Sequence, residues 1–246
     1  MLNTVFYDGP DATPLLIAHG LFGSARNWNV IAKRLSATRP VTVVDMRNHG
    51  ASPWFDTHTY PEMAEDLAGV MDQKMDVLGH SMGGKAAMML ALRRPELVQR
   101  LVVADIAPVA YSHSQMGPLD AMRAVDLSVV DDRADAIAQM DGLSEPLIQF
   151  LLQSLDIKNK RWKLNLDVLA AQMDKIVGFP DVVGSFDGPT LFLSGATSDY
   201  VQHSHRDRIK ELFPQSYFAK LSGAGHWLHA EKPRKFEASV AAFCSV

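Results

Sequence analysis

The sequence predicts an α/β protein built on a mostly parallel sheet flanked by helices. Short runs rich in aliphatic and β-branched residues alternate with longer segments of helical periodicity, which is typical of successive β-α-β units. This alternation stops between residues 106 and 188, where the apolar pattern is helical, and it then resumes. We therefore expect one sheet domain, residues 1–106 and 189–246, interrupted by a helical insertion, residues 107–188.

The expected strands are short, apolar and followed by turn residues. They are Thr4 to Tyr7, Leu15 to Ala18, Val41 to Val44, Met75 to Leu78, Leu101 to Ala104 before Asp105, Leu191 to Ser194 and Tyr217 to Leu221. The helices expected between and after them contain Trp28 to Leu35, Met63 to Met71, Ala86 to Leu92, Ile209 to Phe213 and Pro233 to Cys244. Within the insertion we expect only helices and loops, with apolar helical patches at Ile137 to Met140, Leu147 to Leu155 and Val168 to Ile176.

Composition excludes several classes of protein. With 47% hydrophobic and 21% charged residues the chain can bury a core, and its 24 basic and 28 acidic residues are interspersed, which argues against nucleic acid as a partner. The apolar stretch Leu101 to Ala110 contains Asp105 and Pro108 and is shorter than the ~20 residues of a membrane span. The first eight residues show no secretory pattern and Cys244 is the single cysteine, so we expect a cytoplasmic protein. No heptad or apolar stripe points to an oligomeric state.

A candidate nucleophile lies between a predicted strand and a predicted helix. Gly79-His80-Ser81-Met82-Gly83 is a G-x-S-x-G sequence in the context that a nucleophile elbow requires. Glycines suit this turn because side chains beside the serine would collide with neighbouring backbone. We expect Ser81 to be the nucleophile of a hydrolase.

A serine hydroxyl needs a base, and histidine has the suitable pKa. Of the nine histidines, His226 stands in Gly225-His226-Trp227 between the last predicted strand and helix, where a loop can return to the serine. His19, His49 and His80 lie in glycine turns and are expected to shape the backbone. The pairs His203/His205 and His226/His229 lack further ligands at metal-site spacing, so we expect no metal.

Two aspartates could orient the imidazole of His226. Asp105 ends the strand after the nucleophile helix, and Asp199 follows the strand Leu191 to Ser194. Both preserve the chain order serine, aspartate, histidine. At this point the residues leave both candidates open.

Two backbone N–H groups are expected to form an oxyanion hole. One belongs to Met82, directly after the serine. The other belongs to the turn His19-Gly20-Leu21-Phe22-Gly23-Ser24 after the second strand, with Leu21 as the first choice and Phe22 as the alternative. Lys85, one turn into the nucleophile helix, is expected to be exposed or paired with an acid such as Asp66, without a catalytic part.

These motifs, together with Asp45 to Pro53 and Asp105-Ile106-Ala107-Pro108, resemble the α/β-hydrolase superfamily, and more closely the small bacterial YbfF-type esterases and their abhydrolase-domain relatives. The resemblance implies an eight-stranded sheet, a helical cap at residues 107–188 and ester hydrolysis without a cofactor. Because only Thr4 to Tyr7 reads as a strand before Leu15, we expect seven or eight strands.

The resemblance also favours Asp105 as the acid. In the common superfamily pattern Gly-x-x-Asp-x-x-Val, Gly195 and Val201 would place the aspartate at position 198, which is Ser198 here, and Asp199 is one residue off. The similar esterases carry the acid after the strand that follows the nucleophile helix, which matches Asp105.

The predicted function is therefore hydrolysis of small-molecule carboxylic esters with short to medium acyl chains through an acyl-enzyme on Ser81. Alternatives on the same triad are a thioesterase and a carbon–carbon bond hydrolase; from another class, the chain could be a ligand-binding protein with a vestigial site. An apolar acyl pocket could draw on two groups of residues. The insertion offers Leu147, Ile148, Phe150, Leu151 and Trp162, and the core loops offer Phe22, Trp28, Trp54, Phe55 and Trp227.

Overall fold

The computed structural model describes residues 1–245 and contains a central sheet of seven strands in the order β1-β3-β2-β4-β5-β8-β9. Only β1 is antiparallel to its neighbour, β3, and all other adjacent strands are parallel. The strands are β1 (Thr4–Tyr7), β2 (Leu15–Ala18), β3 (Val41–Val44), β4 (Met75–His80), β5 (Val98–Ala104), β8 (Thr190–Gly195) and β9 (Ser216–Leu221). The mostly parallel α/β sheet predicted from the sequence is confirmed, and among the described residues this sheet has seven strands.

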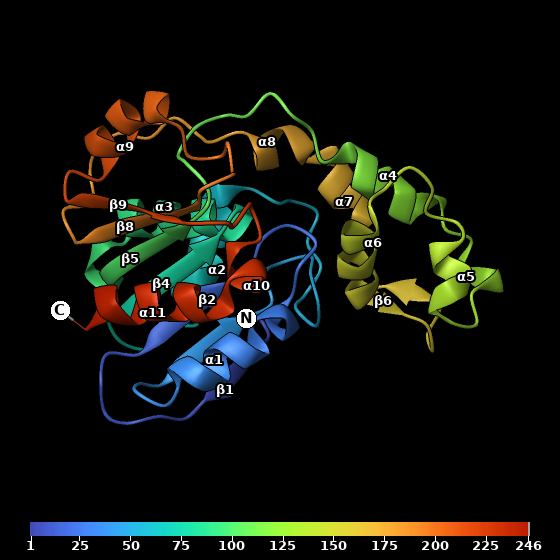
Figure 1. The fold of residues 1–246 in the computed structure, drawn as a ribbon, viewed down its shortest axis with the longest axis horizontal. Helices are drawn as coiled ribbons and strands as arrows, with labels where there is room; N and C mark the ends of the chain where they lie inside the picture. The colour runs from blue at the N-terminus through green and yellow to red at the C-terminus, as the bar shows by residue number, and fades with distance from the viewer. Residues whose placement is uncertain (246) are drawn as a thin grey trace.

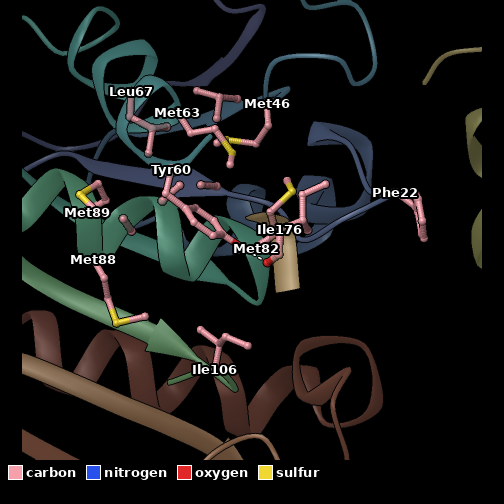
Figure 2. Close-up of a cluster of buried hydrophobic side chains, with 14 of the residues drawn as sticks. Phe22, Met46, Tyr60, Met63, Leu67, Met82, Met88, Met89, Ile106 and Ile176 are labelled. Atoms are coloured by element: carbon pink, nitrogen blue, oxygen red, sulfur yellow. Dashed lines mark hydrogen bonds between the residues drawn. The ribbon is translucent and has the colours of Figure 1, made fainter. Parts of the chain in front are cut away.

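Helices cover both faces of this sheet, which explains why its central strands are apolar at consecutive positions. In β2, Leu15 and Ile17 pack into one buried cluster, while Leu16 and Ala18 pack into the other. The first cluster lies under α1 (Asn29–Leu35), α10 (Leu228–Glu231) and α11 (Pro233–Cys244), and the second lies under α2 (Tyr60–Ala68), α3 (Met82–Arg93) and α9 (Arg206–Leu212). Figure 1 shows the two helix layers on either side of the strands, and Figure 2 shows the cluster under α2 and α3.

The strand order reverses at β2, because β3 lies on one side of it and β4 on the other. In open α/β sheets the loops at the carboxyl ends of the strands around such a reversal form a crevice where ligands bind. The loop after β2 begins at His19, and the turn after β4 contains Ser81. The fold thus brings the two glycine-containing motifs to the same edge of the sheet.

The segment between β5 and β8 forms a separate group of short elements beside the sheet (Figure 1). Its helices are α4 (Met116–Ala124), η3 (Leu127–Val129), α5 (Arg133–Ile137), α6 (Glu145–Leu151), η4 (Leu152–Ser154), α7 (Leu166–Ala171) and α8 (Met173–Val177). The expectation that it holds only helices and loops is wrong, because β6 (Leu155–Asp156) and β7 (Arg161–Trp162) form a hairpin. The Asp156 carboxylate accepts hydrogen bonds from Asn159, and Lys160 adopts a positive φ of 49°, which closes this turn.

One further detail of the segment differs from the sequence pattern. The patch Val168 to Ile176, read as one helical stretch, is divided into α7 and α8 at Gln172. Three further 3₁₀ helices lie outside the segment, η1 (Ala25–Trp28), η2 (Pro95–Leu97) and η5 (His203–His205). Among residues 1–245 no helix has the length and apolar character needed to cross a membrane.

Gly83 lies where α3 closely approaches β2. A Cβ atom at this position would overlap the backbone carbonyl oxygens of Ala18 and His19, which cannot move without disturbing β2. We expect Gly83→Ala to lower the free energy of unfolding by at least ~2 kcal/mol in urea denaturation, as overpacking does. The matched variant Gly117→Ala lies in α4 with open space around it and should change the free energy of unfolding by less than about 1 kcal/mol, because the helix propensity gained over glycine is offset by the strain of a side chain before Pro118. Equal stabilities of the two variants would contradict this packing.

Candidate active site

Ser81 lies on a strained turn between β4 and α3. Its φ of 52° and ψ of −119° fall outside the regions that side-chain-bearing residues normally occupy. Its backbone N–H donates to the Ala104 carbonyl at 3.0 Å, which attaches the turn to the end of β5. The Ser81 side chain therefore stands at the carboxyl edge of the sheet, where the serine motif predicted it.

Ser81, His226 and Asp105 form a hydrogen-bonded chain. The distance from Ser81 Oγ to His226 Nε2 is 3.1 Å, and the distance from His226 Nδ1 to Asp105 Oδ2 is 2.8 Å. Ser81 and His226 are partly exposed, whereas Asp105 is completely buried. This is the geometry in which a carboxylate fixes the imidazole tautomer that can take a proton from the serine.

Asp105 accepts hydrogen bonds from β8 and from the loop that follows it. The Gly195 backbone N–H donates to Oδ1 at 2.9 Å, and the Ser198 hydroxyl donates to Oδ2. Ser198 stands where the common superfamily pattern has its aspartate, and here it supplies a hydrogen bond to the acid on the adjacent strand. Asp199 is exposed, and its backbone carbonyl, not its carboxylate, accepts a bond from Gln202.

Two backbone N–H groups near Ser81 are available to a ligand. Neither Leu21 nor Met82 has an acceptor for its N–H within residues 1–245, and both residues line the cavity beside Ser81. The N–H of Phe22, the alternative predicted from the sequence, donates to His49 Nε2 at 3.2 Å. This bond removes Phe22 from the free donors and favours Leu21.

Buried neutral histidines build the backbone around the site. His80 Nε2 donates to the His226 carbonyl at 2.9 Å, and His19 Nε2 accepts from the Met46 N–H at 2.9 Å. His58 and His229 are also buried, which their sequence context did not indicate. Five imidazoles are buried around the site: His19, His49, His58, His80 and His229. Burial lowers the pKa of each of them, and it lowers the pKa of His58 and of His229 to about 3.

Lys85 departs from its predicted exposure. It is buried, and its ammonium donates to the carbonyls of Val177 and Gly178 at 2.8 and 2.5 Å. Asp66, suggested as its partner, instead accepts from Arg47 Nε at 2.5 Å. No sequence pattern indicates these bonds, because the partners of Lys85 are main-chain carbonyls distant along the chain.

A cavity beside Ser81 and His226 is lined by both the sheet domain and the segment between β5 and β8. Of the aromatic and aliphatic residues predicted for an acyl pocket, Leu147, Phe150, Phe22, Trp28 and Trp227 line it. Ile148, Leu151 and Trp162 are buried elsewhere, and Trp54 and Phe55 are exposed. Its lining also includes Ile106, Tyr111, Ile176, Val177 and Tyr200, which were not predicted.

The Tyr200 ring stacks on the imidazole of His226, with centroids 4.0 Å apart and an interplanar angle of 20°. Tyr200 is itself fixed, because its backbone carbonyl accepts the hydroxyl of Tyr111 at 2.6 Å. This stacking restricts the imidazole plane to the orientation that serves both Ser81 and Asp105. No group of three or more potential ligands in residues 1–245 is placed to hold a metal ion.

Fold and site together define an α/β hydrolase, and the chain belongs to that family: the model of the alpha/beta hydrolase family matches residues 15–239. It is similar to the mouse (Mus musculus) sn-1-specific diacylglycerol lipase ABHD11, with 41% identity over 96% of this chain and 82% of that lipase. It is also similar to esterase YbfF of Escherichia coli (strain K12), with 40% identity over 90% of this chain and 89% of that esterase. A solved structure, a marine microorganism esterase, superposes with a TM-score of 0.93 at 35% identity, covering 99% of this chain and all of that one.

We expect stability to fall in acid because the five buried imidazoles are held neutral. Their folded-state pKa lies below the unfolded value of about 6.5, so unfolding takes up protons once the pH falls below that value. Each proton lowers the free energy of unfolding by about 1.4 kcal/mol per pH unit, until the pH reaches the folded pKa. Urea denaturation between about pH 7 and pH 5 should show an uptake of about two to five protons. A free energy of unfolding that stays level or rises over this range would contradict the neutral cluster.

Proposed function

We propose that the protein is a serine esterase that hydrolyses carboxylic esters with short to medium acyl chains. Its relatives are named esterase and lipase, which supports an ester-hydrolysing enzyme. The observation that carries the mechanism is the hydrogen-bonded chain from Ser81 through His226 to Asp105, with distances of 3.1 and 2.8 Å. The chemistry needs no cofactor.

In the first step, Ser81 Oγ attacks the ester carbonyl carbon while His226 Nε2 takes its proton. The buried Asp105 carboxylate stabilises the imidazolium that forms. The carbonyl oxygen becomes an oxyanion, which the backbone N–H groups of Leu21 and Met82 stabilise. The tetrahedral intermediate then expels the alcohol, which leaves with the proton from His226, and the acyl group stays on Ser81.

In the second step, water replaces the alcohol. His226 removes a proton from the water as its oxygen attacks the acyl carbon, and the same N–H groups stabilise the second oxyanion. Collapse of this intermediate returns the proton to Ser81 Oγ and releases the carboxylic acid. The Tyr200 ring keeps the imidazole in one plane through both steps.

Residues 107–188 serve as a cap over a core formed by residues 1–106 and 189–246. Leu147, Phe150, Ile176 and Val177 of this segment line the cavity, whose volume is about 100 Å³. This room supports an acyl chain of short to medium length.

A cytoplasmic location is proposed from the single cysteine, Cys244, which is buried and unpaired.

The acid is tested by comparing Asp105→Asn with Asp199→Asn on p-nitrophenyl hexanoate. An asparagine at position 105 would hold His226 in the wrong tautomer, so kcat should fall by about 10³- to 10⁴-fold. Asp199→Asn is the matched control, because its exposed carboxylate takes no part, and its kcat should stay close to that of the wild type. Loss of turnover in Asp199→Asn alone would refute the assignment of Asp105.

The nucleophile is tested with a fluorophosphonate probe and intact-mass measurement. The wild type should gain one phosphonyl adduct, because the activated Ser81 hydroxyl attacks phosphorus, and Ser81→Ala should gain none. Equal labelling of both proteins would contradict the mechanism. Parallel assays with an acyl-CoA and a β-diketone test which type of bond the enzyme cleaves. Preferred cleavage of the acyl-CoA would assign a thioesterase, and preferred cleavage of the β-diketone would assign a carbon–carbon bond hydrolase.

A further inference from the structure

Two side chains of the core bind three consecutive carbonyls at the end of the cap's last helix. The Tyr60 hydroxyl, from α2, donates to the Ile176 carbonyl, and Lys85 Nζ, from α3, donates to those of Val177 and Gly178. Figure 2 shows Tyr60 reaching Ile176 across the buried cluster, with this hydrogen bond dashed. The last carbonyls of a helix have no partner within it, so these bonds supply donors that the helix itself lacks.

Lys85 occupies an environment that normally disfavours an ammonium group. The side chain is buried, and no carboxylate in the described residues forms an ion pair with it. Its Nζ lies 4.7 Å from the ring centroid of Tyr111 and 5.7 Å from that of Tyr60, so two aromatic faces and two carbonyls surround the charge. Burial lowers the pKa of Lys85 to about 7, because removing the ammonium group from water disfavours its charged form.

The bonded carbonyls belong to a wall of the cavity. Ile176 and Val177 line the cavity together with Lys85 and Tyr60. The Val177 carbonyl also accepts from the backbone N–H of Tyr111 at 3.1 Å, so the two ends of the cap meet at this residue. The Lys85 and Tyr60 bonds therefore hold the wall to the core, in addition to the Tyr111 bond within the cap.

We propose that Lys85 and Tyr60 are positioning residues that hold the Ile176 and Val177 wall in place and thereby set the length of acyl chain that the site accepts. This inference rests on the proposed esterase function. With both bonds present, the wall contacts a chain that fills the cavity and stops a longer one. Without them the end of α8 is released, so a medium chain loses contacts and a long chain gains room.

The test compares kcat/KM for p-nitrophenyl hexanoate and p-nitrophenyl dodecanoate in Lys85→Met and Tyr60→Phe. A change in the rate of the chemical steps at Ser81 and His226 affects both esters alike, so it cancels in the ratio of the two kcat/KM values. We expect the ratio of hexanoate to dodecanoate to fall about tenfold in each variant, mainly through KM, because pocket contacts discriminate chain length. Tyr60→Phe removes only a hydroxyl, so it carries the test if Lys85→Met fails to fold.

Matched controls are Lys74→Met, at an exposed lysine, and Tyr7→Phe, on the edge strand β1, and both should keep the wild-type ratio. Circular dichroism and thermal melting check that each variant is folded. An unchanged ratio in folded Lys85→Met and Tyr60→Phe, with the wild type active on esters, overturns the role of the wall. A wild type that hydrolyses neither ester overturns the proposed function itself, and this inference with it.

Discussion

The buried carboxylate of Asp105 is the group on which the arrangement of the site depends. A charge removed from water needs donors, and Asp105 receives them from Gly195, Ser198 and His226. These donors come from β8, from the loop after it and from the loop after β9, so one carboxylate joins three parts of the chain at the carboxyl edge of the sheet. The same edge carries Ser81, whose strained turn is possible because glycines flank it and α3 lies against β2.

The residues around the triad of Ser81, His226 and Asp105 favour a single orientation of the His226 imidazole. His80 bonds the backbone of His226, and the Tyr200 ring stacks on its imidazole. The segment between β5 and β8 contributes part of the apolar lining of the cavity, and Lys85 and Tyr60 attach its last helix, α8, to the core. Polar groups thus hold both the Ser81, His226 and Asp105 side chains and the part of the cavity wall that Ile176 and Val177 form.

Much of the fold could be predicted because its central strands are buried on both faces and therefore read as continuous apolar runs, as in Leu15 to Ala18. Ser81 and His226 stood in local motifs, whereas the choice of Asp105 over Asp199 needed the resemblance, because both aspartates follow a strand. The β6–β7 hairpin was missed because two-residue strands leave no periodic pattern. Burial of Lys85, His58 and His229 was also missed, because their contacts join residues far apart in sequence.

The central claim is that hydrolysis passes through an acyl group on Ser81. Acid-quenching the enzyme during the first turnover of p-nitrophenyl hexanoate, followed by peptide mass spectrometry, tests it most directly. The account predicts a burst of p-nitrophenol that matches the amount of enzyme, with the hexanoyl mass on the peptide that contains Ser81. Full turnover with no acylated Ser81, or with the acyl group on another residue, would contradict it.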